Sequence, residues 1–351
     1  MSSTTATQTT DAPTFTDSVN NAPHEYKFYN YDPSKALTYV AFILFGIWTL
    51  IIGIEIFVEY VRTVNLFKTT LAYDLHRAQI RKTIKSVCLF SYIPLILGGL
   101  MEMGGYIGRL ASIYQTHTII AFVVETVLIL IAPVLISATI YMLFHRLLKY
   151  LNVPENSRIG IIFKNSLMVK FFVAGDIISF LLQVAGGAMT AEESTMHLGE
   201  KLVIIGLIVQ LVSFGVFLFV QTHFTLRYEK FCENFFHLEV TGKWKIYNYS
   251  LLMASVLIFV RSIMRVAEFG QGYDGYIGTH EVFLYVFDAL LMLMTLMVLS
   301  VSFFFTDIGE IYFQHFTITY SQNEAQSKLT ACKTNTIESY EENSNNDFSV
   351  V

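Results

Sequence analysis

Charged residues are scarce in this sequence. Of 351 residues, 15% are Asp, Glu, Lys or Arg and 54% are hydrophobic, whereas soluble globular chains carry about a quarter charged residues. So little charge excludes a soluble globular chain, disorder over most of the length and nucleic-acid binding. The formal net charge of −5 is also too small to steer a partner electrostatically. Thirty Phe, 20 Tyr and 12 Met instead indicate helices that face lipid.

Cysteines are few in this sequence, and the common catalytic motifs are absent from it. The cysteines, Cys88, Cys232 and Cys332, are too few and too scattered for a disulfide framework or a metal site. The chain contains no P-loop, no HExxH helix and no GxSxG elbow. We therefore expect no enzyme and no cofactor, and any active transport needs a proton gradient, a partner or a downhill substrate. Residues 1–30 lack the apolar segment of a cleavable signal peptide.

Long apolar runs dominate the remaining sequence. A helix needs about 20 mostly apolar residues to cross a bilayer. Seven stretches qualify: Ala36–Tyr60, Ser86–Tyr106, Thr118–Phe144, Leu167–Met189, Leu202–Phe224, Tyr247–Phe269 and Val282–Phe305. The sequence thus predicts an all-α, polytopic membrane protein with a Ser/Thr-rich tail (residues 1–35), a seven-helix membrane domain (36–305) and a polar tail (306–351).

Lys and Arg are distributed unevenly between the connecting loops. The loops after the first, third and fifth spans hold fourteen of them, whereas those after the second, fourth and sixth hold only Arg109 and Lys201. Basic loops remain cytoplasmic, so we expect the N-terminus outside and the C-terminus in the cytosol. The glycosylation sequon at Asn248 then lies at the cytoplasmic end of its span and should stay unmodified.

Ionisable side chains within the spans are the candidate site, because charge in hydrocarbon is costly and usually functional. Arg261, Arg265 and Glu268 share one helix face, and three other spans also have a polar face. These faces lie in the outer half of the bundle, where we expect them to converge. The ten candidates are Glu102, Arg109, Glu125, Asp176, Gln183, Arg261, Arg265, Glu268, Glu281 and Asp288.

Two interpretations of these charges remain open. They form either a permanent network that holds the helices in register or an outward-facing polar pocket beneath an amphiphile's headgroup. Five carboxylates against two arginines in the outer parts of the spans favour a cationic amine or a proton site over a phosphate. Glu55, Glu59 and Lys170 lie toward the cytoplasmic ends, where we expect them at the interface. Pro94 and Pro133 predict kinks, and the glycine pairs predict close helix packing.

Seven spans with an outer N-terminus also suggest a receptor. Against that class, the third span ends in His145-Arg146-Leu147 rather than in an acidic-Arg-aromatic triplet. The seventh span has neither an NPxxY motif nor a lysine for a retinal Schiff base. An unrelated class of lipid sensor, signalling through cytoplasmic loops and tail, remains the alternative function.

Several spaced motifs resemble those of the fungal Rta-like, or lipid-translocating exporter, family. The resemblance covers residues 31–305 and includes EMGGYIGR at 102–109, the Ala132-Pro133 pair with Tyr141 and Arg146, DIIS at 176–179 with Gln183, RSIMRVAE at 261–268, and Glu281 with Tyr285 and Asp288.

This resemblance implies a multi-pass protein of the plasma membrane that moves amphiphiles or confers resistance to them. In character the chain is most similar to the family's sphingoid long-chain base exporters, so the expected partners are membrane lipids such as sphingoid bases. On this view Asp176, Glu268 and Asp288 are amine or proton sites. Arg261 and Arg265 hold the geometry of those carboxylates, while Glu102 and Arg109 line the exit.

Overall fold

The computed structural model describes residues 34–68, 90–114, 119–150, 167–190, 194–235, 241–271 and 275–305, and every regular element within these ranges is a helix. The all-α prediction is therefore confirmed for this part of the chain. In order, the helices are α1 (Lys35–Lys68), α3 (Ile93–Tyr114), α4 (Ile119–Tyr150), α6 (Leu167–Met189), α7 (Met196–Phe235), α8 (Thr241–Gly270), the short α9 (Tyr276–Thr279) and α10 (Glu281–Leu284), a π-helical segment η2 (Tyr285–Leu290), and α11 (Leu291–Phe305).

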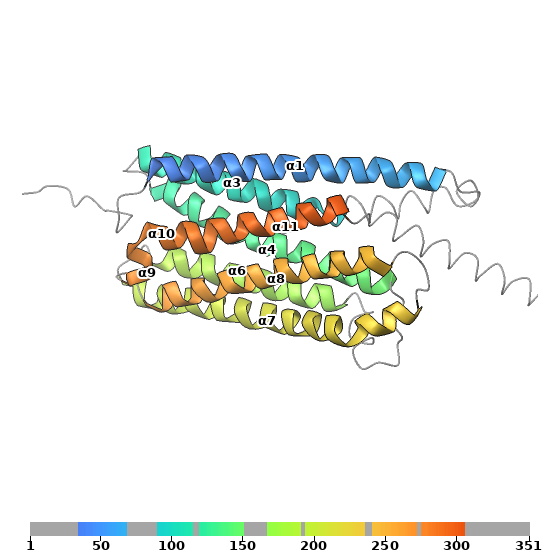
Figure 1. Ribbon diagram of the computed structural model, residues 1–351. Coiled ribbons are helices and arrows are strands. Elements are labelled where there is room, and N and C mark those ends of the chain that lie inside the picture. The colour runs from blue at the N-terminus through green and yellow to red at the C-terminus, as the bar shows by residue number, and fades with distance from the viewer. Residues whose placement is uncertain are drawn as a thin grey trace, which may run out of the picture.

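Six of the described helical segments are long and apolar enough to cross a membrane, and the last of them consists of α10, η2 and α11 together. The remaining predicted span corresponds to α3, which has 22 residues but carries Glu102, Arg109 and several glycines. Both of these charged side chains are buried in the bundle. Figure 1 shows the long helices running side by side. Residues 1–33, the predicted polar tail (306–351) and six of the fourteen basic loop residues lie outside the described residues.

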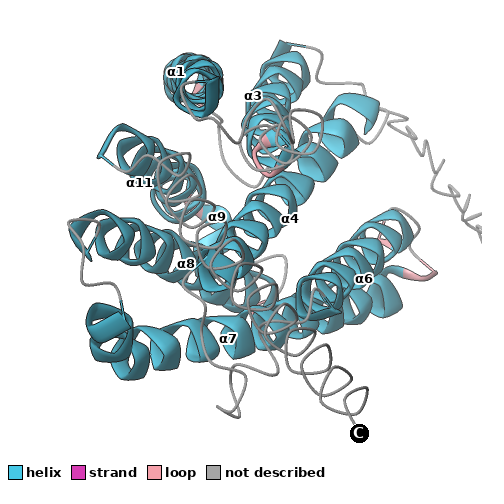
Figure 2. Cartoon of the chain, turned by 90° about the vertical axis from the view of Figure 1, so that its right-hand side faces the viewer, coloured by secondary structure: helices cyan, strands magenta, loops and turns pink. Residues whose placement is uncertain are grey.

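The helices pack in a ring. Each of α1, α3, α4, α6, α7, α8 and α11 contacts the next, and α11 returns to α1. Helix α4 also reaches across to α8, so it lies at the centre of the end-on view in Figure 2. Of the six apolar segments, α4 is the most enclosed, with 61% of its apolar window buried against 28–39% for the others. Helix α4 is thus the helix most surrounded by its neighbours.

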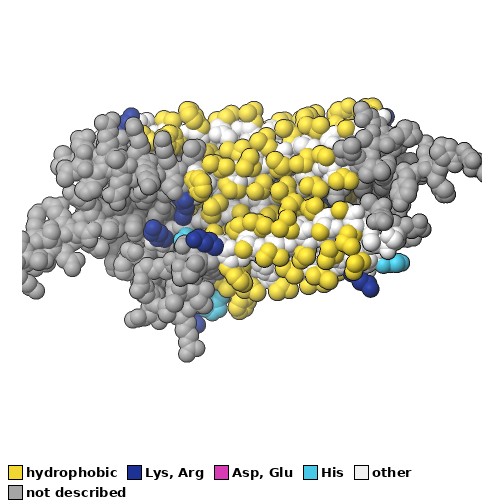
Figure 3. Space-filling view, turned by 180° about the vertical axis from the view of Figure 1, so that it is seen from behind, with side chains coloured by type: hydrophobic (Ala, Val, Ile, Leu, Met, Phe, Trp, Pro, Cys, Tyr) yellow, Lys and Arg dark blue, Asp and Glu magenta, His cyan; other side chains and the backbone are white. Residues whose placement is uncertain are grey.

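The outer surface of the bundle is apolar. Large hydrophobic side chains such as Phe57, Phe171 and Phe219 point outward and are more than half exposed. Figure 3 shows hydrophobic side chains across the middle of one face, with Lys and Arg toward its two ends. An apolar belt of this kind is unfavourable in water and favourable in a bilayer. The described helices thus form the core of a multi-pass membrane protein.

The two prolines behave differently. Helix α3 begins at Ile93, so Pro94 lies in its first turn. A missing N–H has little effect there, since first-turn amides have no intrahelical acceptor. Residues 69–89 lie outside the described part of the chain, so the kink expected in this span at Pro94 stays a prediction. Pro133, in contrast, lies inside α4 as expected.

Close helix packing at the glycine pairs is confirmed for α6 and α7. A Cβ atom on Gly186 would lie 2.7 Å from both the carbonyl oxygen of Gly199 and the amide nitrogen of Val203. Only a residue without a side chain allows the two backbones to approach this closely. A Cβ atom on the neighbouring Gly187 would have nothing within 4 Å, so only one member of that pair packs against α7.

Candidate functional site

Arg109 is the centre of an ionic cluster at one end of the bundle. Its guanidinium lies 2.9 Å from Oε1 of Glu125 on α4 and 3.0 Å from Oε1 of Glu281 on α10. Glu281 also accepts two hydrogen bonds, of 3.0 and 2.9 Å, from the backbone N–H of Ser34 just before α1. One arginine and two carboxylates thus join the ends of four helices.

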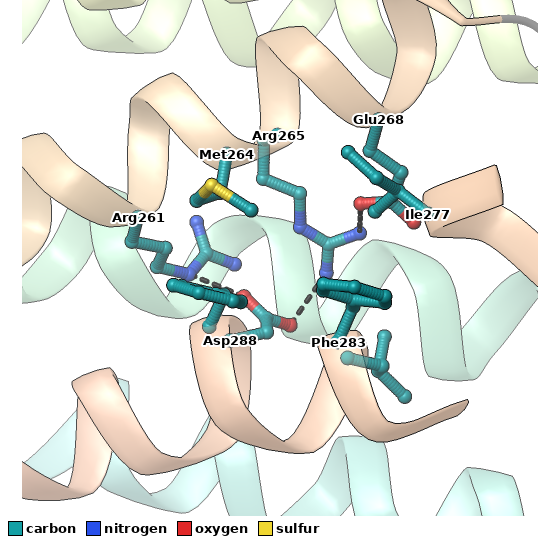
Figure 4. Close-up of a pocket in the computed structure, with 9 residues that line it drawn as sticks. Arg261, Met264, Arg265, Glu268, Ile277, Phe283 and Asp288 are labelled. Carbon is teal, nitrogen blue, oxygen red and sulfur yellow. Dashed lines mark hydrogen bonds and ion pairs between the residues drawn. The ribbon is translucent and has the colours of Figure 1, made fainter. Parts of the chain in front are cut away.

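A second cluster forms where α8 faces η2. Asp288 lies between the two arginines of α8 in Figure 4. Its Oδ1 is 2.5 Å from Nε of Arg261, and its Oδ2 is 2.5 Å from Nη2 of Arg265. Arg265 also pairs with Glu268, one turn further along α8, at 3.2 Å. The shared helix face predicted for these three α8 residues is therefore directed at Asp288.

The π-helical segment helps to position Asp288. A π-turn changes the direction in which the following side chains point, and such segments are frequent at functional sites. Here η2 runs from Tyr285 to Leu290, and Asp288 and Ala289 are its buried residues. The irregular backbone therefore coincides with the carboxylate that two arginines share.

Pro133 provides a backbone partner for Arg261. Proline has no N–H, so the carbonyl of the residue four positions earlier, Ile129, lacks its usual helical donor. Arg261 Nη2 donates to that carbonyl oxygen at 3.5 Å, a long hydrogen bond. The proline in α4 thus exposes an acceptor at the level of the arginine cluster.

Glu102 is buried beside this cluster without a hydrogen-bond partner for its Oε1 atom among the described residues. It interacts electrostatically with Asp288, Arg261 and Arg265. A small pocket is lined by the two arginines and Asp288 together with Glu268, Ile277 and Phe283 (Figure 4). Its volume is about 10 Å³, enough for about one water molecule. In this conformation the pocket is too small for a larger headgroup.

Asp176 lies apart from the arginines. Its Oδ2 accepts hydrogen bonds from Ser137 Oγ at 2.7 Å and from Tyr141 at 3.0 Å, both on α4. Ser137 follows Ile129 by eight residues, or roughly 12 Å along the helix. Asp176 is thus separated from the arginine clusters by about two turns of α4.

Gln183 also lies outside the arginine clusters. Its amide donates to Gln210 Oε1 on α7 at 2.9 Å, and both side chains are buried. The residues of α6 therefore face two neighbours, with Asp176 against α4 and Gln183 against α7. Of the ten candidates, eight lie in or beside the two arginine clusters, and these two do not.

Several polar contacts were not expected from the sequence. Glu55, expected at the cytoplasmic interface, has a partner that the sequence did not indicate, because both of its carboxylate oxygens accept from Ser300 of α11 at 2.9 Å. Glu59 is likewise buried in the bundle. Neutral pairs also join α7 to α8: Ser255 donates to Gln221, and Asn248 donates to Thr225. The prediction considered mainly charged residues. The Ser, Thr, Asn and Gln residues within the spans were the signal that could have indicated these contacts.

Apolar spanning helices around buried ion pairs define a multi-pass helical membrane protein. The profile of the family described as "RTA1 like protein" matches residues 95–308, and the chain belongs to this family. The family predicted from the spaced motifs is thus confirmed. No solved structure matches the chain.

The relatives come from Saccharomyces cerevisiae and have different names. Protoporphyrin uptake protein 1 is 35% identical, covering 82% of this chain and 95% of the relative. Protein RTM1 is 37% identical, with coverages of 81% and 94%. Sphingoid long-chain base transporter RSB1 is 27% identical, with coverages of 60% and 63%. The identity is therefore higher to the first two than to the sphingoid base transporter.

Proposed function

We propose that this protein transports single-chain amphiphiles with a cationic headgroup, such as sphingoid long-chain bases, toward the outer leaflet of the plasma membrane. The observation that carries the proposal is a surplus of acid in the two arginine clusters. Three arginines face five carboxylates, which are Glu102, Glu125, Glu268, Glu281 and Asp288. An ammonium group would supply part of the missing positive charge.

The proposed topology of seven spans supports delivery to the outer leaflet. Basic loops hold one end of the bundle in the cytosol, which places the Arg109 cluster and the Arg261–Asp288–Arg265 cluster toward the outside. A headgroup in the pocket beside Glu268 then lies near the outer leaflet. Because the pocket is too small for a headgroup here, entry requires α8 and η2 to separate, and Glu102 is positioned to accept an arginine that Asp288 releases.

One relative is named for protoporphyrin uptake, which suggests a porphyrin as an alternative cargo. A porphyrin carries carboxylates and would bind Arg261 and Arg265 in competition with Asp288, whereas an ammonium would bind the acids. The acid surplus supports the ammonium. A direct comparison of the two substrates in the same cells distinguishes them.

The test is export of a labelled sphingosine-type base from cells that carry Asp288→Asn, Glu268→Gln or Glu102→Gln. Each variant is expected to lower export several-fold at equal surface abundance. The matched control is Glu200→Gln, which removes a partly exposed carboxylate from α7 and should leave export unchanged. If Asp288→Asn and Glu268→Gln both reach the surface and export normally, the site is wrong. A loss of porphyrin movement rather than of base export would reassign the cargo.

Purified protein in liposomes separates a transporter from a sensor. Unaided movement of labelled base between leaflets supports the transporter. No movement in liposomes, together with loss of a cellular response when residues 320–351 are deleted, would favour the sensor.

A further inference from the structure

Asp176 is a buried carboxylate that no described cation neutralises. The residue is 1% exposed. Ser137 and Tyr141 both donate to its Oδ2, and its Oδ1 has no hydrogen-bond partner among the described residues. A charged carboxylate with an unsatisfied oxygen is costly in a low-dielectric interior. The position is therefore built to bind a positive species.

The surrounding side chains limit the size of that species. The Tyr141 ring lies 4.5 Å from Phe217, 5.5 Å from Phe172 and 5.9 Å from Phe214, measured between ring centroids. Rings at these distances are in contact and leave no space for an alkylammonium group on the Tyr141 side of the carboxylate. A proton is the positive species that needs no such space.

The charged and titratable neighbours of Asp176 are few. Among the described residues of α4, Tyr141 is the titratable group that contacts it. Helix α7 presents Ser213, Phe214 and Phe217 at this level, and none of them titrates near neutral pH. Protonation of this site is thus a property of one carboxyl group.

We propose that Asp176 is the proton-binding site that couples amphiphile export to proton entry, an inference that rests on the transport function proposed above. Asp176, Ser179 and Gln183 are buried at i, i+3 and i+7 of α6. This polar face extends from Asp176 toward the proposed outer end and provides a route for a proton. One proton moving inward for each ammonium exported leaves the net charge on each side unchanged.

Helix α4 connects the proton site with the arginine site. Pro133 lies between Ile129, whose carbonyl accepts from Arg261, and Ser137, whose hydroxyl donates to Asp176. A proline weakens the helical hydrogen bonding at this point, so the two halves of α4 can reorient. A change in the hydrogen bond between Ser137 and Asp176 is thereby transmitted toward Arg261.

A test of the proton site that does not depend on transport activity is infrared difference spectroscopy. The purified full-length protein is measured during a pH titration. We expect a titrating carboxylic-acid carbonyl band that is absent in Asp176→Asn. Tyr141→Phe keeps the aromatic ring but removes one donor, so it should shift the midpoint of that band. Absence of the band in the native protein, or its persistence in Asp176→Asn, would overturn the assignment.

Coupling is tested in liposomes with the membrane potential clamped. An imposed pH gradient should change the export rate of the native protein several-fold. The ratio of the rate with the gradient to the rate without it should fall to one in Asp176→Asn. The Glu200→Gln control should keep the native ratio. Coupling through Asp176 is refuted if the pH gradient still changes the export rate of Asp176→Asn. It is also refuted if the gradient has no effect on the export rate of an active native protein. If the native protein moves no amphiphile, the transport function fails, while the infrared titration still decides whether the proton site exists.

Discussion

At the scale of single residues, Arg109 shows how a charge is retained inside this bundle. Its side chain is 2% exposed, and both Glu125 and Glu281 contact it directly. Removal of Arg109 would leave two largely buried carboxylates without this cation. Such a change is far more destabilising than the loss of a surface ion pair.

We therefore predict that Arg109→Gln lowers the free energy of unfolding by about 3–5 kcal/mol, the usual cost of breaking a buried ion pair. The measurement is thermal unfolding of the purified protein in detergent. Lys170→Gln is the control, since Lys170 is exposed on α6 and its replacement should change stability little. Equal melting temperatures for Arg109→Gln and the native protein would mean that the ion pairs contribute nothing to the fold.

Residue chemistry in the sequence predicted which side chains would be polar and buried, but not their partners. Asp176 and Gln183 are seven positions apart and were expected on one face, yet they contact different helices. A helix face is wide enough to border two neighbours, so spacing alone cannot assign a partner. The contact between Glu55 and Ser300 was not predicted either, because α11 is distant from α1 in sequence.

At the scale of secondary-structure elements, the contact between α6 and α7 depends on the absence of side chains. Gly186 and Gly199 bring the two backbones together, and Gly206 lies near the carbonyl of Ser179. Without a hydrophobic effect between helices in lipid, such close packing supplies much of the association energy.

Gly186→Ala is expected to destabilise the protein by about 1–3 kcal/mol, the typical cost of overpacking, because its Cβ would meet α7 backbone atoms. Gly187→Ala is a closely matched control, one residue away with open space around its Cβ position. Thermal unfolding of the two variants side by side provides the comparison. A larger loss in Gly187→Ala would contradict the observed packing.

Prolines illustrate the limit of prediction at this scale. The sequence predicted kinks at Pro94 and Pro133, and Pro94 lies in the first turn of α3. The position of a helix start decides whether a proline is tolerated or disruptive. The π-helical segment at Asp288 was not predicted either, because its backbone depends on packing against α8.

At the scale of the whole molecule, the topology remains a prediction from the distribution of Lys and Arg. The Asn248 side chain is 1% exposed and donates to Thr225. Its burial agrees with a sequon that stays unmodified.

A glycosylation acceptor inserted into residues 1–33 should be modified, whereas the same acceptor inserted into residues 306–351 should not, because we expect the N-terminus outside. A gel shift that endoglycosidase reverses reports modification. The native protein, with only Asn248 as acceptor, is the unmodified reference. Modification of the C-terminal acceptor alone would invert the topology.

The sequence by itself determined the membrane location of the helices, their approximate limits, the candidate polar residues and the family, because hydrophobicity, charge and motif spacing are local properties. The tertiary structure decided which charges meet. It separated Asp176 from the arginines, placed Asp288 between Arg261 and Arg265, and gave the Ile129 carbonyl a partner. These pairings depend on rotation and contact between helices distant in the chain, which no local pattern specifies.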